Sequence, residues 1–186
     1  MAIPSNSENT SLPPEYEVIK FHGATNLVIL EQICKLRLSV WQDQKVKMVG
    51  DFSSGSWSDA EEVKSTHWAV FYAGELVAAS RMTIYNFLSE LPDARFYQEL
   101  PEISAMPIGY LTRDVVLKEH QGKGLGEYFN RVRISELRNV RAKTVLASIP
   151  DYRISSFEKL GVKLIREPRL GYVFPEMKWA VVSMSL

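Results

Sequence analysis

The sequence has one clear β-hairpin near its middle, and this hairpin restricts the folds open to the chain. Two β-branched, aromatic and apolar segments, residues 67–72 and 76–84, are joined by Ala73-Gly74-Glu75, which is typical of a tight turn. A hairpin pairs its two strands antiparallel, so the chain cannot form a purely parallel, doubly wound sheet. We therefore expect a mixed sheet.

Strand-like and helix-like segments alternate on both sides of this hairpin. Further strands are predicted at residues 15–21, 109–117, 144–149, 162–165 and 177–184. Helices are predicted from about Asn26, where Thr25 or Asn26 can cap the helix, from Leu125 to about Val140 and over 151–160, with short helices inside 42–66 and at 93–100. The element order β-α-(α)-β-β-β-α-β-α-β-β describes an α/β fold, in which helices flank one mixed, mostly antiparallel sheet.

Composition favours one globular domain. The 186 residues carry 22 Lys and Arg against 22 Asp and Glu, and 46% are hydrophobic, enough for a sizeable core. We expect a flexible N-terminal tail at residues 1–14 and a single domain at 15–186. Zero formal charge argues against nucleic-acid binding. No signal-peptide or membrane-spanning pattern is recognisable, which favours a cytoplasmic protein with no membrane partner.

The single cysteine, Cys34, lies among apolar residues at helical spacing. Such a thiol is typically buried and inert, so we do not expect it to act as a nucleophile. One cysteine and three separated histidines make no recognisable ligand pattern, and no metal is expected.

A glycine-rich turn, Gln121-Gly122-Lys123-Gly124-Leu125-Gly126, joins a predicted strand to the following helix. Glycines let backbone N–H groups approach a ligand closely, and a helix start adds unpaired N–H groups and a positive dipole end. A plain turn would need only one glycine, so this combination favours a phosphate or pyrophosphate site. The spacing matches neither the G-x-G-x-x-G dinucleotide pattern nor a P-loop.

This turn resembles the pyrophosphate loop of the GNAT superfamily of acyl-CoA-dependent N-acyltransferases. The family pattern Gln/Arg-x-x-Gly-x-Gly/Ala is met by Gln121, Gly124 and Gly126. Residues 111–116, Leu-Thr-Arg-Asp-Val-Val, are similar to the strand before that loop. Residues 156–162, Ser-Phe-Glu-Lys-Leu-Gly-Val, are similar to the family's Phe-Tyr-Glu-Lys-Leu-Gly-Phe helix end. The resemblance implies a single-domain GNAT fold in which strands four and five splay apart.

The resemblance also implies an activity and a binding site. The activity is transfer of acetyl from acetyl-CoA, as cosubstrate, to an amine of a small molecule or peptide by direct attack. The strand end would bind the pantetheine through its backbone, and the loop would hold the pyrophosphate, with Lys123 adding a charge-assisted contact. The residues expected to bind the cosubstrate are Val115, Val116, Leu117, Gln121, Gly122, Lys123, Gly124, Leu125, Gly126 and Phe157.

The catalytic candidates are Tyr110, Asp114 and Tyr152. The family often has a Glu where this chain has Tyr110, a thiolate-protonating Tyr at Phe157 and an Asn at Pro150, so three usual groups are replaced. Tyr110 could act at its shifted position, although an ordinary phenol, with a pKa of about 10, is a poor base at neutral pH. Asp114 either pairs with an arginine or faces the substrate, and Tyr152 is either a packing or a catalytic residue.

The acceptor is not identified by the sequence, because the arginines and aromatic residues that could bind it also have structural interpretations. Arg81 and Arg113 interrupt apolar strands, either to bind a substrate carboxylate or to form structural ion pairs. The aromatic-rich segment 85–107 forms either a lid or wall of an acceptor pocket or part of the core. A mostly solvated helix face is expected for Arg131, Arg133, Arg138 and Arg141, one of which could instead attract the adenosine 3′-phosphate of the cosubstrate.

Two other functions stay open. Residues 36–41, Leu-Arg-Leu-Ser-Val-Trp, faintly resemble autoinducer synthases, which suggests an autoinducer-synthase-like or N-acyl amino acid synthase with a longer acyl donor. Replacement of the usual catalytic groups at Tyr110 and Phe157 suggests instead a non-catalytic acyl-CoA sensor. A homodimer formed through the last strands also stays open.

Overall fold

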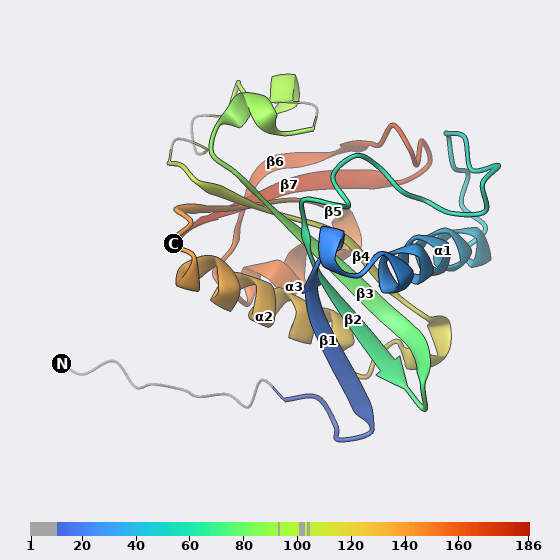
Figure 1. Cartoon of the computed structure of the whole chain (residues 1–186). Coiled ribbons are helices and arrows are strands. Elements are labelled where there is room, and N and C mark those ends of the chain that lie inside the picture. Colours follow the sequence, from blue (N-terminus) through green and yellow to red (C-terminus); the bar gives the residue numbers. More distant parts are fainter. Residues whose placement is uncertain (1–10, 93, 101–102, 104) are drawn as a thin grey trace.

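The computed structural model describes residues 11–92, 94–100, 103 and 105–186, and within them seven strands form one sheet (Figure 1). The strand order is β1-β2-β3-β4-β5-β7-β6. The strands are Tyr16–His22 (β1), Thr66–Tyr72 (β2), Glu75–Tyr85 (β3), Ile108–Val116 (β4), Thr144–Pro150 (β5), Lys163–Leu170 (β6) and Lys178–Ser185 (β7). The helices are Leu27–Asp43 (α1), Leu125–Asn139 (α2) and Ile154–Glu158 (α3).

The sheet is mixed, as the hairpin predicts. Strands β2 and β3 form that hairpin, with Tyr72 paired to Glu75 across the turn. Every neighbouring pair of strands is antiparallel except β4 and β5, which run parallel. Helix α1 packs on one face of the sheet, and α2 and α3 pack on the other (Figure 1). The predicted α/β fold with a mostly antiparallel central sheet is confirmed.

Helix α1 is capped by Asn26, one of the two predicted cap residues. The side chain of Asn26 accepts a hydrogen bond from the backbone N–H of Ile29 at 3.1 Å, which satisfies one free donor of the first turn. The helix buries the face that carries Ile33, Cys34 and Trp41, whereas Leu27 is exposed. Burial raises the pKa of the Cys34 thiol, which fits the expected inert residue.

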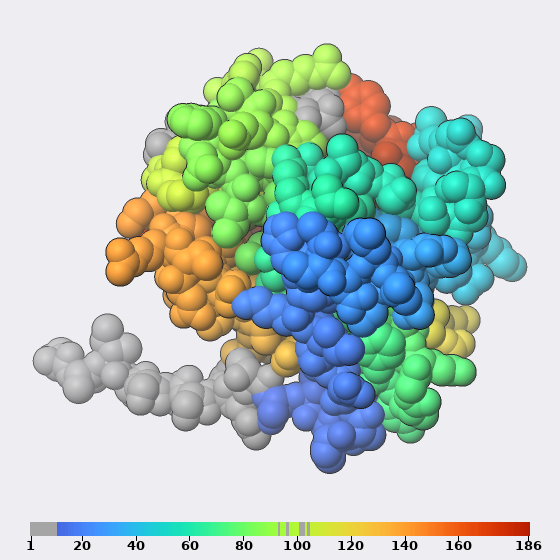
Figure 2. All heavy atoms as spheres, viewed as in Figure 1, coloured from blue at the N-terminus to red at the C-terminus, as the bar shows by residue number. Residues whose placement is uncertain are grey.

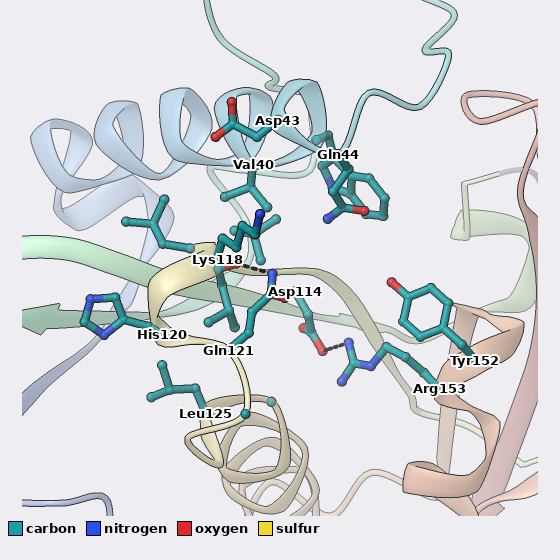
Figure 3. Close-up of a pocket in the computed structure, with 16 residues that line it drawn as sticks. Val40, Asp43, Gln44, Asp114, Lys118, His120, Gln121, Leu125, Tyr152 and Arg153 are labelled. Atoms are coloured by element: carbon teal, nitrogen blue, oxygen red, sulfur yellow. Dashed lines mark hydrogen bonds and ion pairs between the residues drawn. The ribbon is translucent and has the colours of Figure 1, made fainter.

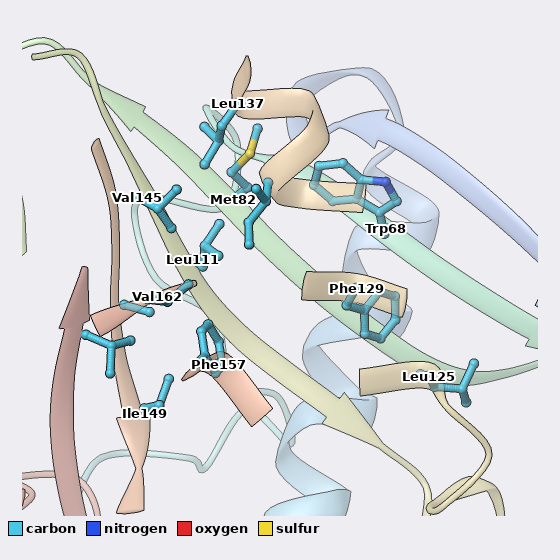
Figure 4. Close-up of a cluster of buried hydrophobic side chains, with 14 of the residues drawn as sticks. Trp68, Met82, Leu111, Leu125, Phe129, Leu137, Val145, Ile149, Phe157 and Val162 are labelled. Carbon is cyan, nitrogen blue, oxygen red and sulfur yellow. The ribbon is translucent and has the colours of Figure 1, made fainter. Parts of the chain in front are cut away.

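The larger hydrophobic core lies between the sheet and helices α2 and α3 (Figure 4). Phe129 and Leu137 of α2 and Phe157 of α3 are almost completely buried there against Leu111 of β4. Burying each such side chain contributes about 1.5–3 kcal/mol, so this cluster fixes α2 and the turn before it against β4.

Some predicted elements differ from the structure. Residues 44–65 contain turns and no α-helix, because their polar and glycine-rich sequence offers no apolar helical face. The helix predicted at 93–100 is a 3-10 turn at Ala94–Phe96, and its predicted start, Asp93, lies outside the described residues. The predicted tail lies outside them as far as residue 10, and Leu12 packs against the core.

Strand β4 has a β-bulge at its centre. Ala79 of β3 pairs with Val115, but Arg81, two residues on, pairs with Thr112, so β4 carries one extra residue. Arg113 lies in the bulge with φ of +61°, a left-handed conformation that is uncommon for a residue other than glycine. A bulge bends its strand and redirects the side chains beyond it.

Strands β4 and β5 part close to this bulge. Their parallel pairing ends where Leu111 faces Ala147, although β4 continues to Val116 and β5 to Pro150. The predicted splay of strands four and five is therefore confirmed, and it leaves one edge of β4 without a strand partner in the described part of the chain.

Two connections border the gap on the α1 side of the sheet. The 44–65 loop meets the β6–β7 connection, where the N–H of Val49 donates to the carbonyl of Val173 at 2.8 Å. Figure 2 shows these segments, cyan and red, adjoining on the surface. Among the described residues, no helix combines the length and the apolar character needed to cross a bilayer.

Candidate active site

The gap between β4 and β5 opens into two pockets, of about 600 Å³ and about 490 Å³. The first, the loop pocket, lies between the end of α1, the end of β4 and the glycine turn (Figure 3). Its lining includes Gln44, Val116, His120, Gly122 and Leu125. The second, the aromatic pocket, has a lining that includes Trp57, Tyr97, Tyr110, Phe174 and Trp179.

The two pockets meet at four shared side chains. Trp41 of α1, Asp114 of β4, and Tyr152 and Arg153 of the 3-10 turn after β5 line both of them. A molecule lying along the loop pocket can therefore meet a second molecule in the aromatic pocket at this junction.

Left-handed glycines shape the turn before α2. Gly122 has φ of +74° and Gly124, the N-cap of α2, has φ of +83°, so both positions favour glycine, which adopts this conformation without strain. In the described part of the chain no side chain caps α2, which leaves the N–H groups of its first turn for water or a ligand. Gly122, Leu125 and Gly126 line the loop pocket, whereas Lys123 and Gly124 lie outside its lining.

The end of β4 forms the opposite wall of the loop pocket. Val115 and Val116 pair with β3 on one edge, and their other edge faces the gap. Leu117 also lines the pocket, but its N–H donates to Val77 at 2.9 Å. The side-chain amide of Gln121 donates to the carbonyl of Val116 at 3.1 Å (Figure 3), which fixes the glycine turn to the strand end.

Comparison with known proteins identifies the fold. No family model and no curated protein matches the chain. BjaI, a CoA-dependent acyl-homoserine lactone synthase solved with SAM and isopentyl-CoA, matches with TM-score 0.68 and 12% identity, over 91% of this chain and 83% of its own. An acyl-CoA N-acyltransferase from Pseudomonas aeruginosa matches with TM-score 0.61 and 16% identity, over 90% and 98%. The chain has the GNAT fold.

A third solved structure of this GNAT fold is FeeM, an N-acyl amino acid synthase from uncultured soil microbes. It matches with TM-score 0.66 and 9% identity, over 93% of this chain and 92% of its own. At such identities the likeness is one of fold, so the chemistry of this chain has to be argued from its own residues.

Within the GNAT fold, Asp114 points from the bulged strand toward α2 and forms two ion pairs. Arg133 approaches Asp114 Oδ1 at 2.6 Å, and Arg153 donates to Oδ2 at 3.0 Å (Figure 3). The arginine partner expected as one alternative is therefore present, while Asp114 also lines both pockets. The prediction that Arg133 lies on a solvated face is wrong. Arg133 is completely buried, because Asp114 on β4, beneath α2, compensates its charge.

Tyr110 lines the aromatic pocket and is buried. Its hydroxyl lies 2.8 Å from the hydroxyl of Tyr97, which belongs to the 85–107 segment. Both rings are buried and pack in a cluster with Tyr85 of β3. This segment thus joins the core through Tyr85 and Tyr97, and Tyr97 also lines the aromatic pocket.

Tyr152 and Phe157 differ in burial and in the pockets that they line. Tyr152 is mostly exposed at the junction, where partial desolvation raises the pKa of its phenol and Arg153 offsets part of that rise. Phe157, predicted to bind the cosubstrate, is buried in the core and lines the aromatic pocket but not the loop pocket. The guanidinium of Arg153 lies over its ring at 5.5 Å.

An ion-pair cluster lies beside the aromatic pocket and joins Arg37, Asp59, Glu62, Arg81 and Arg113. Glu62 accepts from Arg37 at 2.5 Å and from Arg81 at 2.8 Å. Asp59 accepts from Arg81 and from Arg113, each at 2.6 Å. Burial alone would raise the pKa of Asp59, but the two guanidinium groups hold it well below its ordinary value. Ion pairs, one alternative for Arg81 and Arg113, are therefore present.

Sequence reasoning missed Asp59 and Glu62. They lie in the 44–65 loop, far along the chain from their partners in β3 and β4. The available signal was indirect: an arginine inside an apolar strand needs a buried carboxylate, and this loop carries acidic residues. Among the described residues, no group of three or more His, Cys, Asp and Glu side chains is arranged to hold a metal ion.

Proposed function

We propose that the protein is an acyl-CoA-dependent N-acyltransferase that acylates an amine of a small molecule or peptide. In this proposal the acyl-CoA lies in the loop pocket and the amine acceptor in the aromatic pocket. The observation that carries it is the junction of the two pockets where β4 and β5 part, next to a glycine turn that opens an uncapped helix. A pyrophosphate suits that turn, and pantetheine suits the open edge of β4.

The proposed step is direct attack by the acceptor nitrogen on the thioester carbonyl carbon. The N–C bond forms, the C–S bond breaks, and CoA leaves as a thiolate. The nitrogen loses one proton and the sulfur gains one, so protons and electrons balance. Tyr152 fits the second proton transfer, because a phenol with a raised pKa is protonated at neutral pH and lies at the junction.

The remaining candidates take supporting roles in this proposal. Asp114 holds Arg153 at the junction, and the Tyr110–Tyr97 pair lines the acceptor pocket. Gly122 to Gly126 supply N–H groups to the pyrophosphate, and Gln121 keeps the turn on β4. We propose acetyl-CoA as the donor, and the apolar walls of the aromatic pocket keep a longer acyl chain as the alternative.

Thermal unfolding in the presence of CoA thioesters tests this function. A ligand at 100 times its Kd stabilises the native state by about 2.7 kcal/mol, so a bound donor raises the melting temperature. We expect acetyl-CoA to raise it and CoA to be released when an amine acceptor is added. A shift with decanoyl-CoA but not acetyl-CoA would favour the longer donor, and a shift without turnover on any amine would favour a sensor. No shift with any CoA thioester would refute the proposal.

A further inference from the structure

The ion-pair cluster beside the aromatic pocket contains one more cation than it has anions. Three arginines, Arg37, Arg81 and Arg113, share the two carboxylates of Asp59 and Glu62. A buried charge is costly unless it is paired, so a surplus cation in such a cluster needs either solvent or an anionic ligand.

The surplus falls on Arg113. Arg37 and Arg81 are buried, and each makes several hydrogen bonds, to Glu62 and to Trp57 or Thr112 among others. Among the described residues, Arg113 has one polar contact, from Nη2 to Asp59, and that carboxylate is shared with Arg81. Most of the five N–H donors of its guanidinium are therefore left for another partner.

The side chain of Arg113 lies at the wall of the aromatic pocket. Its guanidinium lies over the indole of Trp57 at 4.1 Å, which fixes its plane, and its side chain is about one-fifth exposed, at 21%. Both residues line the aromatic pocket. Burial and the neighbouring Arg37 and Arg81 lower the pKa of Arg113, which marks a cation short of negative partners.

The lining of the aromatic pocket as a whole also carries a positive net charge. Among the described residues, its charged side chains are five arginines and two aspartates, a surplus of three positive charges. Arg166 and Arg169 supply two of these arginines from β6. The indole N–H of Trp179, in the same lining, is buried and has no hydrogen-bond partner among the described residues, so it is a further donor. The loop pocket has no such surplus, since Asp43 and Asp114 balance Lys118 and Arg153 there.

We propose that the aromatic pocket binds an acceptor amine that also carries a carboxylate, and that Arg113 is the residue that holds this carboxylate. The planar fork of an arginine matches a carboxylate, and the stacked indole pre-orients it. The aromatic walls, Trp41, Trp57 and Phe174, suit an apolar body on the acceptor. Amino acids with apolar side chains carry all three groups: an amine, a carboxylate and an apolar body. This inference rests on the proposed function.

Paired acceptors test the carboxylate directly. We suggest L-phenylalanine against 2-phenylethylamine, and L-leucine against 3-methylbutylamine, because each pair differs only in the carboxylate. With the acyl-CoA that raises the melting temperature most, we expect kcat/KM for the amino acid to exceed that for the amine at least tenfold. Equal values, or calorimetric binding of neither amino acid to the CoA-bound protein, would overturn the inference and leave the acyltransferase proposal standing.

Variants of Arg113 test the assigned residue. We expect R113Q to raise KM for L-phenylalanine at least tenfold and to change kcat/KM for 2-phenylethylamine less than threefold, while R113K keeps part of the preference. Comparing each acceptor between variant and wild type cancels the difference in basicity within a pair. R138Q, on an exposed position of α2 outside both pockets, is the matched control.

Three results would overturn the role of Arg113. Equal losses for both members of a pair would mean that it only supports the fold, and a lowered melting temperature would accompany that result. A weakened affinity for acyl-CoA would mean that it binds a phosphate of the cosubstrate instead. An unchanged KM for the amino acids would mean that another group binds the carboxylate.

Discussion

Arg153 donates a hydrogen bond to Asp114 at 3.0 Å across the gap where β4 and β5 have parted. Arg153 follows β5 and Asp114 lies on β4, so this ion pair replaces the backbone pairing that the strands have lost. Arg133 of α2 donates to the same oxygen, Oδ2, at 2.7 Å, and its Nη1 lies 2.6 Å from Oδ1. One carboxylate therefore ties together β4, α2 and the turn after β5 at the point where the two pockets meet.

The D114N variant should be strongly destabilised. Arg133 is completely buried, and removal of its charged partner leaves an uncompensated buried cation, which costs about 3 kcal/mol. Chemical denaturation at pH 7 measures the loss. The control is E127Q, which breaks the partly exposed Glu127–Arg131 pair of the same helix and should cost less than about 0.5 kcal/mol. Equal losses of unfolding free energy in the two variants would show that the burial of Arg133 does not add to the cost of losing its charged partner.

Replacing Gly124 should abolish acyl-CoA binding. A valine at its φ of +83° is strained by about 1–2 kcal/mol, and relief of that strain turns the N–H groups of the loop away from a pyrophosphate. Gly74, in the β2–β3 turn, has nearly the same φ of +81°, so G74V carries a similar strain away from both pockets. Calorimetric titration with acetyl-CoA should show binding lost in G124V and kept in G74V. Retained binding in G124V would refute the placement of the pyrophosphate.

Gly126 permits a test in which binding and stability change in opposite directions. An ideal Cβ there meets only Arg153 Nη2, at 3.6 Å, so a side chain fits. An aspartate in the first turn of α2 should stabilise the fold by about 0.5 kcal/mol through the helix dipole. The same charge should repel a pyrophosphate and lower acyl-CoA affinity at least tenfold. An affinity equal to that of wild type, in a G126D protein with an unchanged or raised melting temperature, would contradict the proposed site.

A structural feature can be predicted from this sequence when the residues that determine it are neighbours in the chain. The hairpin at Gly74, the cap at Asn26 and the glycine turn at Gly124 are set by neighbouring residues, and these predictions are confirmed as structural features. The parting of β4 and β5 was predicted only through resemblance to a family.

The features that were missed depend on residues distant in sequence. Asp59 and Arg113 are 54 positions apart, and nothing local to the 44–65 loop marks a carboxylate that accepts two guanidinium groups. Arg133 was assigned to the solvated face because a helical pattern treats arginine as polar, whereas an acidic partner on a packed strand permits its burial.

Tyr152 should be needed for turnover but not for donor binding. If its phenol protonates the leaving thiolate, Y152F should lower kcat by about 100-fold and leave the affinity for acyl-CoA unchanged. Y128F, on a half-buried α2 residue outside both pockets, is the control. The pKa of Tyr152 is raised above the ordinary phenol value of about 10. Deprotonation of this phenol should therefore not lower kcat below pH 10. Wild-type kcat in Y152F would assign the proton to another donor.

Asp59 should make the fold sensitive to acid. Its pKa is lowered in the folded state by Arg81 and Arg113, so between that value and the unfolded value of about 3.9 the unfolded chain binds more protons. The stabilisation is therefore complete above about pH 5 and is lost as the pH falls below 4. Urea denaturation should show D59N to be less stable than wild type at pH 7, with the difference shrinking toward pH 2. D51N, which alters an exposed carboxylate outside the cluster, should show a far smaller difference at pH 7. A gap between D59N and wild type that stays constant from pH 7 to pH 2 would mean that the ion pairs of Asp59 do not supply its stabilisation.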